Sequence, residues 1–186
     1  SPNYTDVYYE HHLMGTVPTV MAHCIHLSDV EMDRMAETQT MVSHCPYSNV
    51  NLSSGIAPIR KLIERNIPIG LGSDISGGHI VSMAKVLTEA IGLSKMKWVE
   101  VDQTYAPLTL SEAFYMATKG GGKFFGKVGS FEKGCELDAL VIDDTTLFDP
   151  NERSLEERLE RWLYIGDDRH IVERYIAGKV APEPTN

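Results

Sequence analysis

The chain has 186 residues, 42% of them hydrophobic and 23% charged, a balance typical of a folded protein and enough for one domain or part of a larger one. The formal net charge of −9 argues against nucleic-acid binding, which needs a concentrated basic surface, and the apolar runs are too short for a membrane span. Three widely spaced cysteines, Cys24, Cys45 and Cys135, indicate neither a disulfide scaffold nor a thiolate zinc site, and they favour a reducing cytoplasmic compartment.

The first part of the chain alternates predicted strands and helices. An apolar run at 17–23 predicts a short buried strand. Ser28 and Glu31 then have the spacing of a capping box, which starts a helix that we expect to end near Glu37. A second apolar run at 40–45 predicts the next strand.

The same alternation continues through the middle of the chain. Pro58 suits the first position of a helix, and the run at 67–72 predicts a third strand. A longer amphipathic helix follows, with one apolar face around Val86. The spacing at 109–112 predicts another capping box and a helix that extends through Ala117.

Strands that alternate with helices at this spacing indicate parallel βαβ units, and therefore an α/β fold. Three such units cannot close an eight-stranded barrel, which usually needs about 250 residues. The final part of the chain has a different pattern, with a predicted strand at 136–142, a charged helix at 154–163 and two short strands within 170–180. We therefore expect two parts, residues 1–128 and a smaller β-rich part at 129–186.

Polar side chains stand where the three predicted parallel strands end, at His23, His44 and Asp74. Each has an ordinary structural alternative: His23 could be a core histidine, His44 could bond within its own loop, and Asp74 could cap the next helix. Their coincidence on successive strand ends favours a metal or acid–base site, because the carboxyl ends of parallel strands in such folds meet at one edge, where catalytic residues gather.

Two further features invite a functional interpretation that their details do not support. The glycine-rich stretch 121–127 resembles a phosphate-binding loop, but Val128 stands where Ser or Thr should follow and a helix precedes the loop. We interpret it as the turn after a helix. Cys24 and Cys45 flank the strand ends without an obvious activating partner, so we interpret both as small buried hydrophobic residues.

Three segments carry a resemblance to a known family: MAHCIHLS at 21–28, SHCPYSNVNLSSG at 43–55 and IGLGSDISGG at 69–78. Together they resemble the amidohydrolase superfamily in its deaminase branch. The segment WLYIGDDRHIVERYIAGK at 162–179 narrows the resemblance to the guanine deaminases. ELDALVID at 136–143 resembles a strand of the composite β-sandwich that flanks these barrels.

The resemblance implies a fold and a set of roles. The fold would be the C-terminal part of a (β/α)8 TIM-like metal-dependent hydrolase barrel, about strands 6–8, plus strands of the flanking β-sandwich. Asp74 would be a zinc ligand that also contacts substrate and accepts a proton from the metal-bound water. His23 would orient the water or the substrate without binding zinc, and Ser48 and Asn49 would shape the mouth of the pocket. The implied activity is the hydrolysis of guanine to xanthine and ammonia, with a purine as the small-molecule substrate and a homodimer as the assembly.

The sequence departs from the family pattern in one respect. It contains no HxH motif, and the adjacent His11 and His12 cannot replace one, because neighbouring side chains of a strand point to opposite faces. We therefore interpret the chain as a C-terminal fragment whose other zinc ligands lie upstream, so that it does not hold catalytic zinc tightly alone.

Two alternatives stay open. One is another aminohydrolase of this superfamily, acting on a modified nucleoside, a pterin or a triazine. The other is a non-catalytic fragment or assembly unit. We also expect the edge of the first strand to be covered, either by another chain or by a further part of the same protein.

Overall fold

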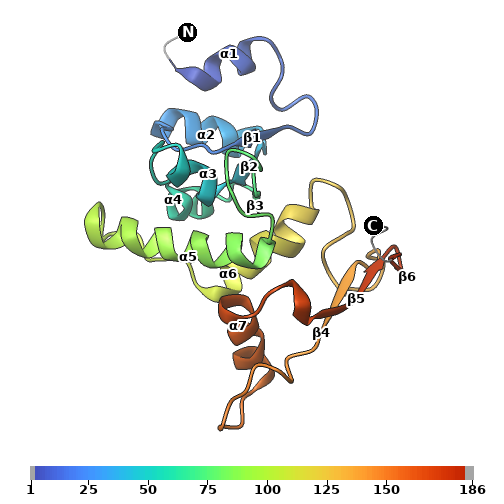
Figure 1. Ribbon diagram of the computed structural model, residues 1–186. Coiled ribbons are helices and arrows are strands. Elements are labelled where there is room, and N and C mark those ends of the chain that lie inside the picture. The colour runs from blue at the N-terminus through green and yellow to red at the C-terminus, as the bar shows by residue number, and fades with distance from the viewer. Residues whose placement is uncertain (1–2, 183–186) are drawn as a thin grey trace.

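The computed structural model describes residues 3–182 as a mixed α/β fold with two separate small sheets (Figure 1). The first sheet is parallel, with strand order β1-β2-β3, and the second is antiparallel, with order β4-β5-β6. The strands are β1 Val20–Ala22, β2 Met41–His44, β3 Ile69–Leu71, β4 Ala139–Ile142, β5 Ile171–Ile176 and β6 Lys179–Val180. The helices are α1 Tyr4–Glu10, α2 Asp29–Glu37, α3 Pro46–Asn51, α4 Ile59–Glu64, α5 Met83–Glu100, α6 Leu110–Tyr115, the π-helix η1 Met116–Gly120, α7 Leu155–Ile165 and the 3-10 turn η2 Asp168–His170.

The parallel sheet confirms the predicted βαβ units. β1 pairs with β2 through Val20 and Met41, and β2 pairs with β3 through Val42 and Ile69. Helix α2 connects the first two strands, and α3 and α4 connect the second and third. Each strand is shorter than its predicted range, because only the residues opposite a neighbouring strand complete the ladder.

The capping boxes confirm the predicted helix starts. The Ser28 hydroxyl accepts a hydrogen bond from the Glu31 amide, and the Glu31 carboxylate accepts one from the Ser28 amide at 2.9 Å. Thr109 begins α6 in the same way, and Ser154 begins α7. Such a pair satisfies amide groups that the helix itself leaves unbonded, and this fixes where each helix begins.

Two local predictions were wrong. Pro58 precedes α4 instead of forming its first residue, because its ψ of 56° lies outside the helical region. The segment after β2, which we expected to be a loop, forms the short helix α3 with Pro46 at its start. A proline at this position costs no hydrogen bond, so the chain can pass directly from strand to helix.

The main core lies between the parallel sheet and the helices that pack on it. Its fully buried side chains include Met35 of α2, Val42 of β2, Leu62 of α4 and Leu87 of α5. Helix α5 crosses the molecule in front of α6 and connects this core to the C-terminal part (Figure 1). The periodicity that predicted α5 is therefore explained by one apolar face on the core.

The C-terminal part combines the antiparallel sheet with α7. The predicted strands and helix are present, and β5 turns back into β6 at Ala177 and Gly178, both with positive φ. Helix α7 packs on α5 through Trp162 and Leu163, which belong to the main core, and Lys85 of α5 donates to the carbonyl of Tyr164 at 2.8 Å. Across residues 3–182, no helix combines the length and apolar composition needed to cross a membrane.

Candidate functional site

The candidate site forms where β1 and β3 end. His23 follows β1 directly, and Asp74 lies three residues beyond β3. Both residues have a positive φ, 67° for His23 and 46° for Asp74, although neither is glycine. This left-handed conformation costs about 1 kcal/mol per residue, and such residues concentrate at functional sites. The backbone at both strand ends therefore carries strain that the surrounding fold maintains.

The two side chains approach each other across the strand ends. The His23 Nε2 atom lies 3.8 Å from the Asp74 Oδ2 atom, and the side chains are 40% and 38% exposed. This separation is too long for a direct hydrogen bond, but one water or substrate atom could contact both groups. The structure thus brings together an imidazole and a carboxylate at a solvent-accessible edge.

Helix α3 adds two buried polar residues behind this pair. The Asn49 Oδ1 atom lies 2.9 Å from His23 Nδ1, and the Asn49 side chain is only 1% exposed. Ser48 is equally buried, and its hydroxyl has no hydrogen-bond partner. The family resemblance implies that both residues shape the mouth of a pocket. In this structure Asn49 contacts the side of His23 opposite to Asp74.

Two glycines allow the loop after Asp74 to pack against α3. A Cβ atom on Gly77 would lie 2.7 Å from Asp74 Oδ2 and 2.8 Å from Ser48 Oγ, and one on Gly78 would lie 2.4 Å from a backbone carbonyl. Asn51 of α3 donates to the Gly77 carbonyl at 2.8 Å, which holds the loop in place. These glycines were not among the predicted site residues, although an adjacent glycine pair so soon after a strand-end aspartate was an available signal.

His44 does not join the pair. It lies two residues from Val42 on β2 and on the same face, whereas Ser43 between them faces the other way. Only 2% of His44 is exposed, its Nδ1 has no partner, and burial, followed by the charge of His23, lowers its pKa to about 4. Its imidazole is therefore neutral at pH 7.

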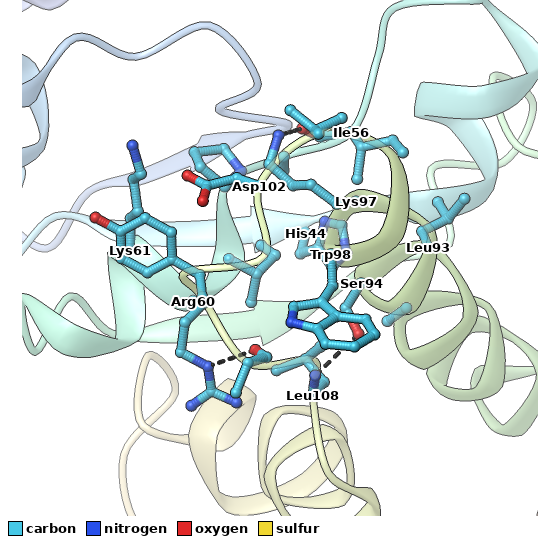
Figure 2. Close-up of a pocket in the computed structure, with 17 residues that line it drawn as sticks. His44, Ile56, Arg60, Lys61, Leu93, Ser94, Lys97, Trp98, Asp102 and Leu108 are labelled. Carbon is cyan, nitrogen blue, oxygen red and sulfur yellow. Dashed lines mark hydrogen bonds between the residues drawn. The ribbon is translucent and has the colours of Figure 1, made fainter.

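The imidazole of His44 lines a separate cavity of about 150 Å³ between α4, α5 and the segment before α6. Figure 2 shows His44 behind Trp98, with Lys97 donating to the Ile56 carbonyl across the opening. Of the three strand-end residues, the structure brings two together and places the third beneath the helices.

The cysteines near the site are buried. Burial raises the pKa of Cys24 to about 12 and raises the pKa of Cys45 as well. The Cys45 thiol contacts Ser43 at 3.6 Å. A thiol of raised pKa carries little thiolate at pH 7 and is a poor nucleophile, which agrees with the interpretation of both residues as small core side chains.

The described residues do not form a metal site by themselves. Zinc in enzymes binds three protein ligands in addition to water, usually His, Cys, Asp or Glu. Asp74 can offer one carboxylate oxygen, but residues 3–182 contain no group of three such side chains close enough to hold an ion. Within residues 3–182, these side chains therefore do not fit a complete zinc site.

Comparisons with a family profile and with individual proteins agree on what this chain is similar to. The sequence profile of the amidohydrolase family matches residues 1–181. Guanine deaminase from Dictyostelium discoideum is 40% identical over 183 residues, which cover 95% of the chain and 40% of that protein. The chain spans less than half the length of this relative.

Solved structures agree in both fold and sequence. The crystal structure of guanine deaminase from C. acetobutylicum with bound guanine in the active site has a TM-score of 0.93 and 51% identity, over 97% of the chain and 43% of that protein. An adenosine deaminase from Xanthomonas campestris with bound zinc has a TM-score of 0.72 and 27% identity, over 87% of the chain and 36% of that protein. The mixed α/β fold described above therefore matches that of these deaminases.

Proposed function

The chain belongs to the amidohydrolase family, and from this premise we propose that the protein containing it hydrolyses guanine to xanthine and ammonia. The choice of guanine is supported by the similarity to guanine deaminases, one of which was solved with guanine bound. The activity would make the protein a hydrolase of the C–N bond of a cyclic amidine. It belongs to the whole protein, because the chain spans only part of the relatives.

One observation of this structure carries the proposal: His23 and Asp74 converge at the carboxyl edge of a parallel sheet, with 3.8 Å between their nearest side-chain atoms. A general acid–base reaction needs two groups that can contact the same water or substrate atom, and an atom beside this pair can lie within hydrogen-bond distance of both. Both side chains are accessible to a ligand, whereas His44, Cys24 and Cys45 are buried.

The proposed chemistry assigns one role to each residue. A zinc ion, when bound with further ligands from the rest of the protein, would lower the pKa of a water toward ~7. Asp74 accepts the proton of the attacking water. The water oxygen bonds to C2 of guanine, and the electron pair of the C2–N3 double bond moves onto N3, which gives a tetrahedral centre. The proton held by Asp74 then passes to the exocyclic nitrogen, the bond from C2 to that nitrogen breaks, ammonia leaves, and the C2–N3 double bond forms again. His23 orients the attacking water or the substrate. Ser48 would line the pocket beside Asp74.

We also propose the architecture that the resemblance implies. Strands β1, β2 and β3 would be about the sixth to eighth strands of a (β/α)8 barrel, and β4, β5 and β6 would belong to a flanking β-sandwich, with a boundary near residue 128. The parallel sheet supports the first part, since its strands alternate with helices as barrel strands do. A homodimer and a cytoplasmic location complete the proposal. The three free cysteines are consistent with that location.

The test is ammonia release by the full-length protein from guanine, adenine and cytosine, together with the variant Asp74→Asn. We expect release from guanine alone and a loss on the order of 10²–10⁴-fold in the variant, because the amide cannot accept a proton. Asp29→Asn is the matched control, since Asp29 lies on α2 with its side chain 72% exposed. It should retain the activity.

Other outcomes would redirect the proposal. A folded, zinc-containing protein that releases no ammonia from guanine would shift the substrate to a modified nucleoside, a pterin or a triazine. A folded full-length protein that binds no zinc and releases no ammonia would favour a non-catalytic assembly unit. Full activity in Asp74→Asn would remove Asp74 from the chemistry.

A further inference from the structure

We propose that Asn49 is a positioning residue that fixes the tautomer of His23, an inference that rests on the proposed function. The Oδ1 atom of Asn49 lies 2.9 Å from His23 Nδ1, a normal hydrogen-bond distance. The opposite ring nitrogen, Nε2, is the one that faces Asp74. The imidazole is thus held from behind by an amide while its other nitrogen reaches the accessible site.

The backbone of α3 holds Asn49 in place. Its amide donates to the Cys45 carbonyl at 3.0 Å, and its carbonyl accepts from the Ser54 amide at 2.8 Å. Its side chain is buried, so it has few alternative rotamers. Since α3 begins immediately after β2, the position of Asn49 relative to the strand ends is set by the fold and does not depend on a flexible loop.

The chemistry of the contact determines the tautomer. An amide oxygen can only accept a hydrogen bond, so the hydrogen between the two residues must be carried by His23 Nδ1. In the neutral ring the lone pair then lies on Nε2. His23 therefore presents a proton acceptor to the site, and a water that lies beside the 3.8 Å gap could donate one hydrogen to Nε2 and the other to the Asp74 carboxylate. The opposite tautomer would leave Asn49 Oδ1 and His23 Nδ1 as two facing acceptors, which repel each other.

The side-chain nitrogen of Asn49 indicates why an amide is present at this position. Its Nδ2 atom is buried without a hydrogen-bond partner. A buried donor without a partner is costly, and leucine of similar size would avoid that cost. Within residues 3–182, the bond to His23 is the only side-chain hydrogen bond of Asn49, and it offsets part of the cost of this burial. The contact with His23 therefore accounts for an amide at this position.

Nitrogen-15 NMR of the full-length protein, labelled on its histidines, tests the proposal directly. The His23 signals, assigned by their loss in His23→Gln, should show a protonated Nδ1 and an unprotonated Nε2. Asn49→Leu, which keeps the size but removes the acceptor, should give a mixture of tautomers. Asn49→Asp, which retains an acceptor oxygen at the same place, should preserve the protonated Nδ1. Val50→Ala, a change on the exposed side of α3, is the control and should leave the His23 signals unchanged.

Kinetics with guanine separate positioning from structural support. Asn49→Leu should lower kcat by on the order of 10- to 100-fold while KM changes much less, because the reacting group is misoriented and the substrate site persists. If Asn49→Leu fails to fold, the nitrogen-15 spectrum of the wild-type protein still shows which nitrogen of His23 carries the hydrogen. A wild-type His23 protonated at Nε2 alone would overturn the proposal, and so would an unchanged tautomer and kcat in a folded Asn49→Leu protein. A protonated Nδ1 in a protein that releases no ammonia from guanine would contradict the proposed function instead.

Discussion

Gly77 occupies the narrow space between Asp74 and Ser48, where side-chain oxygens approach from both sides. We expect Gly77→Ala to displace Asp74 or Ser48, because the added methyl group would lie below 3 Å from both oxygens. Ammonia release from guanine by the full-length variant should fall on the order of 10²-fold.

Gly92→Ala provides the matched control for Gly77→Ala. Gly92 lies within α5, and a Cβ atom there would meet nothing within 4 Å. This change should retain activity and stabilise the helix by roughly 0.5–1 kcal/mol. Equal activity in the two variants would show that the Asp74 loop tolerates a methyl group and would contradict the steric argument.

His44 makes stability depend on pH. Its pKa is lowered from 6.5 to about 4 by burial and by His23, so between these values the unfolded chain binds a proton that the folded chain does not. The contribution of His44 to the free energy of unfolding is therefore fully present above pH 6.5. It decreases as the pH falls toward 4, by up to about 3 kcal/mol in total.

Chemical denaturation of the full-length protein at a series of pH values between 4 and 7 measures the His44 effect. His44→Gln should flatten the dependence in this range, whereas His11→Gln, at the exposed end of α1, should not. An unchanged pH dependence in His44→Gln would mean that other groups dominate the acid sensitivity.

At the scale of elements, the pair of Arg60 and Glu112 connects α4 to the beginning of α6. Two nitrogens of the guanidinium contact the two carboxylate oxygens at 2.6 and 2.8 Å, and Arg60 also donates to the carbonyls of Ala106 and Pro107. The bond from Arg60 is the largest cause that lowers the pKa of Glu112 to about 2. Arg60 also lines the cavity to which His44 contributes.

A double-mutant cycle with Arg60→Gln and Glu112→Gln should give a coupling free energy of roughly 1 kcal/mol at pH 7, since both groups keep partial contact with water. The coupling should decline as the pH falls from about 4.5 toward 2, because Glu112 becomes protonated first in the unfolded chain and then in the folded one. Unfolding in urea measures it. If the coupling free energy persisted at pH 2, its cause would be packing between the two side chains and not their charges.

At the scale of the whole molecule, β1 and β3 are the outer strands of the parallel sheet in residues 3–182. Outer strands expose unpaired backbone groups that attract other chains. We expect the 186-residue chain, expressed alone, to self-associate as its concentration rises, and the full-length protein to form one defined species. Sedimentation velocity over a range of concentrations checks this, and a monomeric 186-residue chain that unfolds cooperatively would contradict it.

Local sequence patterns determined much of this protein. The strands and most helices follow from apolar periodicity and capping boxes, which act over a few residues and therefore need no tertiary information. His23 and Asp74 could be identified as partners because parallel strands direct their carboxyl ends to one edge. Helix α3 escaped prediction, since the short segment after Pro46 lacks an apolar repeat.

The tertiary structure alone decided how the site is assembled. Asn49 contacts His23 across 26 positions of sequence, and the two meet because the β1–β2 pairing and the start of α3 bring them together. His44 lies on the face of β2 opposite to Ser43, so the packing of helices on that face buried it away from the pair. The sequence could therefore name the groups capable of chemistry, whereas which of them meet depends on strand faces and interatomic distances that only packing sets.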